Sequence, residues 1–228
     1  MIFSLTKNCN NRLALVLVSI IFLIPFSSYA AEDSQLFQEL LNRIAQQLGT
    51  NVEVARSFIT EVDGMATAIQ NNFEKIASDK TNYSEKLRLK RITVREFFSG
   101  SNAIVQISSL HRKMLVEKGI DVYLTHLAGL YKKYHTVELK FDKNYFKLGE
   151  IKHFYEGRQQ GKKYFEFTVD MWQMFIGCYD DFGNNCYKDW TKKGFHMIFK
   201  DENPWSYRVK AITVEDTISH DEYEIRKR

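Results

Sequence analysis

The spacing of apolar residues changes once along the chain, from a helical period in the first half to strict alternation in the second. Between residues 34 and 130, apolar residues recur every three or four positions, whereas from residue 135 onward they recur every second position. The first spacing is typical of amphipathic helices and the second of half-buried strands. This order predicts an α+β protein in which a strand meander follows a group of helices.

Four helical segments are predicted in the first half of the chain. They cover residues 34–48, 52–76, 83–98 and 120–134. Asn51 precedes the second segment, where an asparagine side chain can cap the first turn. Asn82 and Glu85 form a capping pair at the start of the third segment. A short strand is predicted between the last two helices, within residues 103–110.

The longest strands are predicted at residues 164–178 and 186–199, joined by a turn at 180–185. If Cys178 lies opposite Cys186, the residue numbers of every opposed pair add up to 364. That register also aligns an apolar stripe on both strands, which a slip of one residue would destroy. The aligned pairs are Phe165 with Phe199, Phe167 with Met197, and Val169 with Phe195. The cysteines and the apolar pattern therefore predict the same hairpin.

Three further strands are predicted from alternation, at residues 137–141, 151–156 and 205–217. In the last strand the apolar positions change phase between Ala211 and Ile212, which is typical of a β-bulge and bends a sheet. We therefore expect an α+β fold in which one curved antiparallel sheet wraps around a long N-terminal helix. The segment at 34–48 is an extra N-terminal helix.

The N-terminus has the features of a secretory signal peptide. Lys7 and Arg12 precede an apolar run at residues 13–26, and a small-x-small site ends at Ala30. The run is shorter than the roughly 20 residues of a membrane span, although an uncleaved anchor is the alternative. Cleavage after Ala30 predicts a periplasmic or secreted protein without a stable membrane span. The remaining chain divides into a helix extension (31–50), one domain (51–220) and a C-terminal tail (221–228).

The charge of the chain gives no reason to expect a nucleic-acid partner. The full sequence has a formal net charge of +4, and residues 1–30 contain two basic residues and no acidic one, so the exported part carries +2. The densest basic run lies at residues 86–95 of the third helix. We interpret it as the solvated face of that helix, with contact to an anionic partner as the alternative.

Only Cys178 and Cys186 remain after signal cleavage, an even number in a compartment where disulfides persist. We expect them to be bonded to each other. A metal site and a reactive thiol are the alternatives, but no further metal ligands occur nearby in a recognisable spacing. No metal and no cofactor are predicted.

Several segments together resemble the nuclear-transport-factor-like, or cystatin-like, superfamily. They are the long helix, the FFSGSN element at 97–102 before a strand, YLTHL at 123–127, and the terminal meander. More narrowly, VREFFSGSNAIVQISSL, YKDWTKK and AITVEDT resemble exported members from Bacteroidetes-type bacteria. The resemblance covers residues 52–219 and implies a cone with one open end, often in a homodimer. It implies no single activity, because this fold hosts isomerases, dehydratases, binders and scaffolds.

The open end of such a cone is where a ligand would bind, and one face of the hairpin becomes polar in that direction. We expect the following residues at the pocket mouth: Met171, Gln173, Asp189, Thr191 and Lys193, with Tyr123 from the fourth helix. The alternative is that the hairpin extends past the core and this face meets water.

The opposite face of the hairpin carries Trp172, Met174 and Trp190. An aromatic patch there predicts either a homodimer interface or a surface covered by the helix at 34–48. A platform for a ligand is the third possibility.

Four residues are candidates for catalysis: Asp170, His126, His153 and Tyr123. None lies in a catalytic motif, and Asp170 belongs to the face away from the apolar stripe, which argues against a buried general base. We therefore predict no catalytic residue and expect an exported binding or protein-interaction module, whose partner is a small molecule or an envelope protein. The alternatives are a cofactor-free lyase or isomerase for a small apolar ligand, and a scaffold subunit of an envelope complex.

Overall fold

The computed structural model describes residues 35–111, 114–154, 164–180, 183, 185–200 and 206–227. The signal peptide and cleavage site predicted at residues 1–30 lie outside this part of the chain. Among the described helices, none combines the length and the hydropathy that crossing a bilayer requires.

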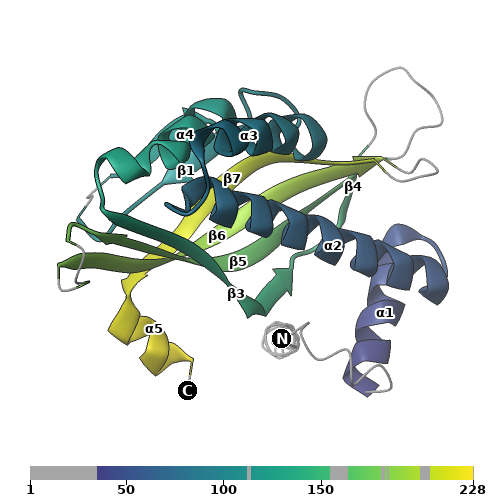
Figure 1. The fold of residues 1–228 in the computed structure, drawn as a ribbon. Helices are drawn as coiled ribbons and strands as arrows, with labels where there is room; N and C mark the ends of the chain where they lie inside the picture. The colour runs from purple at the N-terminus through teal and green to yellow at the C-terminus, as the bar shows by residue number, and fades with distance from the viewer. Residues whose placement is uncertain are drawn as a thin grey trace, which may run out of the picture.

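The fold is α+β, as the sequence predicts, with helices on the concave side of a curved, mostly antiparallel sheet (Figure 1). The strands follow the order β2-β1-β7-β6-β5-β3, with β4 beside β5, and among the described strands only the β1–β7 pair is parallel. The elements are α1 (Gln35–Leu48), α2 (Val52–Ala77), α3 (Tyr83–Phe97), β1 (Ile104–Ile107), β2 (Val116–Gly119), α4 (Ile120–Ala128), the 3₁₀ helix η3 (Leu130–Lys132), β3 (Thr136–Leu148), β4 (Lys152–Phe154), β5 (Tyr164–Cys178), β6 (Cys186–Lys200), β7 (Ser206–Ser219) and α5 (His220–Arg226).

Helix α2 forms the centre of the core, and its buried residues run from Ala55 to Ala77. The Asn51 side chain accepts a hydrogen bond from the backbone nitrogen of Val54 at 2.9 Å, which caps the helix as predicted. Phe58 is fully buried, and its ring centroid lies 5.3 Å from that of Phe167 and 4.9 Å from that of Phe199. Each such buried side chain contributes about 1.5–3 kcal/mol.

The β5–β6 hairpin has the register that the sequence predicts. Cys178 lies opposite Cys186, and the pairing continues without a shift to Phe165 opposite Phe199. The two cysteines form a disulfide bond. The rings of Phe165 and Phe199 stack with their centroids 4.6 Å apart, so the apolar stripe builds the core at this end of the hairpin.

Strand β7 contains the bulge that the phase change indicates. Its pairing with β6 shifts between His196 and Met197, next to Ala211, and shifts again between Lys192 and Lys193. Strand β2 was not predicted, because four residues with one apolar position give no detectable period. Helix α4 ends at Ala128 rather than at residue 134, and a 3₁₀ turn follows Gly129.

The basic run of α3 is not wholly a solvated face, so that interpretation was wrong for Lys86. Its side chain is only 1% exposed, and its ammonium donates to the carbonyl of Ala128 at 3.5 Å. The ammonium also lies 5.2 Å from the ring centroid of Tyr131, and burial lowers the Lys86 pKa. A charged residue in this run is expected to face solvent, but the long apolar stem of a lysine allows Lys86 to pack between α3 and α4.

Helix α1 does not cover the tryptophans of the hairpin, contrary to one prediction. It packs against α2, where the guanidinium of Arg56 lies 5.3 Å from the ring centroid of Phe37 (Figure 1). Gly49 ends α1 with a φ of 65°, a left-handed conformation that glycine adopts without strain.

Residues 220–226, most of them assigned to a C-terminal tail from the sequence, form α5 on the opposite face of the sheet from α3 and α4 (Figure 1). The Ser219 hydroxyl caps this helix by accepting from the backbone nitrogen of Glu222 at 3.1 Å. Tyr223 stacks on Trp190 at 3.9 Å between ring centroids and meets the edge of Trp172 at 5.3 Å. The cover for the aromatic face is therefore α5.

Candidate functional site

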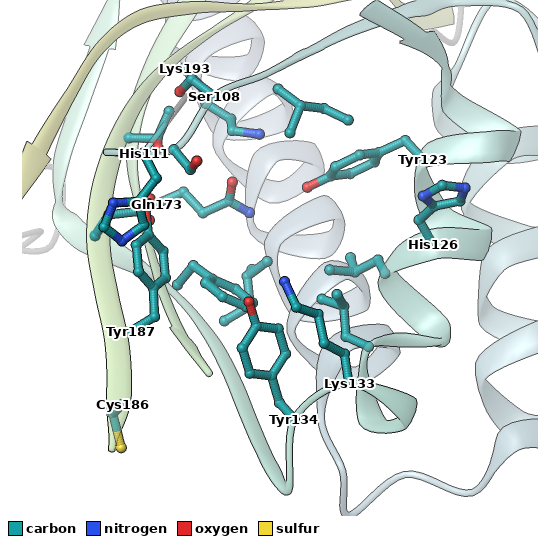
Figure 2. A pocket seen from close by; sticks show the side chains of 18 of the residues that line it. Ser108, His111, Tyr123, His126, Lys133, Tyr134, Gln173, Cys186, Tyr187 and Lys193 are labelled. Carbon is teal, nitrogen blue, oxygen red and sulfur yellow. Dashed lines mark hydrogen bonds between the residues drawn. The ribbon is translucent and has the colours of Figure 1, made fainter. Parts of the chain in front are cut away.

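A cavity of about 620 Å³ lies between the outer half of the hairpin and helix α4 with the following 3₁₀ turn (Figure 2). The segment after β1 contributes the third wall, with Ser108, Ser109 and His111. The cavity lies at the end of the hairpin where its concave face becomes polar, beside the disulfide at Cys186.

The sheet wall of the cavity follows from the two-residue period of the hairpin. Gln173 from β5, and Asp189, Thr191 and Lys193 from β6, all line the cavity and are at most 5% exposed. Met171 was predicted at the same mouth, but it is fully buried and does not line the cavity. On β5 it lies two residues from Gln173, toward the core. Its sulfur accepts a hydrogen bond from the Gln70 side chain of α2 at 2.8 Å.

The helix wall combines aromatic and aliphatic side chains. Tyr123 and Leu127 are four residues apart on α4 and therefore share one helix face, and Leu130 follows in the 3₁₀ turn. The Lys193 ammonium lies 5.2 Å from the Tyr123 ring centroid, which is within the range of a cation–π interaction. This contact joins the two walls at the inner end of the cavity.

Two buried polar groups in the cavity are incompletely satisfied. The side-chain nitrogen of Gln173 is buried and has no hydrogen-bond partner among the described residues. Within the same part of the chain, the Lys193 ammonium has its cation–π contact but no ion pair or hydrogen bond. Because most buried polar groups are hydrogen-bonded, these two donors indicate a place for a polar group from outside the chain.

Asp189 and Tyr187 form a hydrogen-bonded pair nearer the hairpin turn. The Tyr187 hydroxyl donates to the Asp189 carboxylate and accepts from the backbone nitrogen of Leu110 at 2.8 Å. Burial raises the Asp189 pKa, although the Tyr187 hydrogen bond and the positive charge of Lys193 act in the other direction. Burial, followed by the contact with Asp189, raises the Tyr187 pKa as well.

The rim of the cavity is mostly basic. Lys118 from β2 places its ammonium 3.2 Å from the imidazole Nδ1 of His126. The Lys133 ammonium lies 4.9 Å from the ring centroid of Tyr134 (Figure 2). His111 stacks loosely on Tyr187, with ring centroids 5.2 Å apart. Lys118 and Lys133 place positive charge at the entrance.

Tyr134 lies at the rim with its ring directly against Gly177, which has no side chain to displace it. A Cβ atom at Gly177 would lie only 2.7 Å from Cδ1 of the Tyr134 ring, so no larger residue fits there without displacing the ring. Tyr134 also packs against Phe175 at 5.6 Å and Tyr179 at 4.9 Å, measured between ring centroids. The ring closes the side of the cavity between β3 and β5.

The other residues weighed for catalysis do not come together in the cavity. Asp170 lies on the opposite face of the sheet, 3.4 Å from the Lys192 ammonium, and burial raises its pKa. His126 is exposed at the rim, and the His153 backbone pairs with Phe165 in the core, while its side chain lies outside the described residues. Within the described residues, no group of three metal-ligating side chains is placed to hold an ion.

Sequence reasoning missed several lining residues. Phe175 lies opposite Asp189 on the predicted face but was not named as a lining residue. Tyr187 has the same parity as Asp189, so extending the alternation by one pair would have found it. The residues from the β1–β2 segment, β2 and η3 carried no such signal, because only the packing of α4 on the sheet brings them to the cavity.

No family model matches the sequence, and no curated protein sequence matches it significantly. One similar solved structure is described as "Rd1NTF2_04 with long sheet". The likeness covers 67% of this chain and 97% of that chain, at 11% sequence identity and a TM-score of 0.30.

Proposed function

We propose that this chain is an exported, non-catalytic member of the nuclear-transport-factor-like superfamily that binds a small organic molecule in the cavity. The observation that carries the proposal is the combination of a cavity of about 620 Å³ with a buried, unpartnered amide on its wall. Small-molecule sites typically measure about 300–1,000 Å³ and combine apolar walls with a few convergent polar groups.

Two features support export. The first thirty residues have the pattern of a signal peptide, and the Cys178–Cys186 disulfide is the kind of bond that persists in an oxidising compartment. The disulfide joins the two strands next to the cavity.

Native mass spectrometry of the protein purified from its own host tests the proposal. We expect a bound small molecule in the wild type and its loss in Thr191→Phe, which places a bulky ring in the cavity at the polar wall. Thr60→Phe is the matched control, because Thr60 is exposed on α2. Circular dichroism checks that both variants fold. A wild-type protein without any bound molecule, or equal occupancy in Thr191→Phe, would contradict the proposal.

One observation favours the alternative of a cofactor-free lyase or isomerase. Asp189 is a buried carboxyl group in the cavity wall, only 3% exposed, with a raised pKa. A carboxyl group in such a setting is suited to general acid–base catalysis. If the copurified molecule changes chemically during incubation with the wild type but not with Asp189→Asn, the enzyme replaces the binding module. The envelope-scaffold hypothesis stays a prediction.

A further inference from the structure

We infer that the ligand of this cavity is a small carboxylate with an apolar body, whose carboxylate lies against Lys193 and Gln173. This inference rests on the proposed function, since it names the chemical class of the molecule that the cavity binds.

Two neighbouring lysines show why Lys193 is suited to an anion. Lys192 points to the opposite face of the sheet, where its ammonium pairs with Glu215 and lies 3.4 Å from Asp170. Lys193 is more deeply buried, at 4% exposed, yet within the described residues its ammonium forms no hydrogen bond or ion pair. It has the Tyr123 ring beside it and a longer-range attraction to Asp189. A buried charge is normally paired through direct contact, and Asp189 forms no ion pair with Lys193, so a directly bound counter-charge is expected from the ligand.

The unpartnered nitrogen of Gln173 provides the second contact. Gln173 pairs with Thr191 across the hairpin and is therefore a diagonal neighbour of Lys193 on the same face. Long side chains at diagonal positions reach a common point. A carboxylate has two oxygens and is acceptor-only when ionised, so it matches one ammonium donor and one amide donor together.

The other side chains of the cavity determine how the molecule is oriented. Asp189 lies four residues from Lys193 on β6, toward the hairpin turn, so its negative charge disfavours an anion there. The walls between carry Leu127, Leu130 and Phe175, which suit a hydrocarbon or aromatic body. The carboxylate therefore lies at the inner end, and the body extends toward the rim. The basic residues at the rim attract anions to the entrance.

Isothermal titration calorimetry with two matched probes tests the inference at pH 7. The probes are 3-phenylpropionate and its neutral analogue 3-phenylpropionamide, which differ only in the head group. We expect the wild type to bind the acid at least about ten-fold more tightly than the amide. Lys193→Met should remove that preference, and Gln173→Leu should reduce it. Lys210→Met is the control, because Lys210 is exposed and pairs with Glu166 outside the cavity.

Equal affinity for acid and amide, or an unchanged preference in Lys193→Met, would overturn the inference. If Thr191→Phe still abolishes binding of both probes, the cavity is a binding site and only the ligand class is wrong. Much tighter binding of phenyl phosphate would replace the carboxylate with a phosphate. The copurified molecule gives an independent result: an acidic group in it supports the inference, and its absence contradicts it. If no molecule copurifies and neither probe binds, the proposed function fails as well.

Discussion

The outer half of the β5–β6 hairpin has two buried faces that differ in how their side chains are satisfied. On the convex face, Trp172 and Trp190 are 8% and 7% exposed and are covered by Tyr223 of α5. On the concave face, Gln173 and Lys193 are 5% and 4% exposed, yet they border a cavity. The side chains of the two faces are therefore equally buried for different reasons. Those of the convex face are covered by other side chains, whereas those of the concave face enclose a cavity.

The difference separates structural residues from candidate binding residues. The aromatic rings of the convex face are stacked, and the charge of Lys192 is balanced by carboxylates. The Gln173 nitrogen of the concave face lacks a hydrogen-bond partner in the described chain. Burying an unsatisfied polar group costs about 1–3 kcal/mol, so its presence argues for a partner that the chain does not supply.

The largest expected effect comes from removing the centre of the convex cluster. Trp190→Ala should lower the free energy of unfolding by about 3–5 kcal/mol, because it leaves a void between α5 and the sheet. Urea unfolding measures the change. Tyr83→Ala is the control, since Tyr83 is 46% exposed, and its change should stay small. Similar losses of stability in the two variants would show that the packing of α5 on Trp190 does not stabilise the fold.

Removing the disulfide tests how much the bond at the end of the hairpin stabilises the strands that carry both faces. The double variant Cys178→Ala/Cys186→Ala should lose about 2–3 kcal/mol, the chain-entropy value for a loop of this length. Alkylation of the exported protein without reductant provides a direct check by mass. No label is expected, whereas two labelled cysteines would contradict the bond.

The two neighbouring lysines should respond with opposite signs. Lys192→Met leaves Asp170 and Glu215 without their cation and should destabilise the protein by about 1.5–3 kcal/mol. Lys193→Met removes a buried charge that forms no ion pair in the described chain and is attracted to Asp189 only at longer range, so the ligand-free protein should be equally stable or more stable. Urea unfolding of ligand-free protein measures both. Equal destabilisation by the two substitutions would mean that Lys193 is a structural residue.

The close contact under Tyr134 predicts a smaller effect. Gly177→Ala places a methyl group against the ring and should destabilise the protein by about 1–3 kcal/mol. Gly64→Ala is the matched control, because nothing lies within 4 Å of the added methyl group and α2 should gain about 0.5–1 kcal/mol. Thermal unfolding measures the change in stability of both variants. A gain in both would show that Gly177 is not needed to make room for the Tyr134 ring.

The smallest effect concerns pH. The Asp189 pKa in the folded protein is raised above the ordinary 3.8, so the folded state keeps a proton that the unfolded chain has released. The stabilisation from this group is therefore complete below pH 3.8 and decreases as pH rises through the folded pKa. Asp189→Asn should flatten this part of the pH–stability curve. Urea unfolding at a series of pH values measures this curve. If the unfolding free energies of variant and wild type change in parallel from pH 4 upward, the raised pKa of Asp189 is contradicted.

The sequence by itself determined the features that depend on neighbouring residues and on period. The caps at Asn51 and Asn82, the register of Cys178 opposite Cys186, and the bulge near Ala211 all follow from local pattern, and the structure has each of them. A strand period of two also brought together Gln173, Asp189, Thr191 and Lys193, and these line the cavity.

Only the tertiary structure decided which distant elements meet. The residues of α5 carry too short a pattern to predict a helix, yet Tyr223 covers the tryptophans that α1 was expected to cover. Lys86 is buried because α4 happens to pack over it, and the cavity exists because α4 and the turn after it stop short of the hairpin. Local sequence sets the direction of each side chain, but contacts between distant segments depend on how whole elements pack.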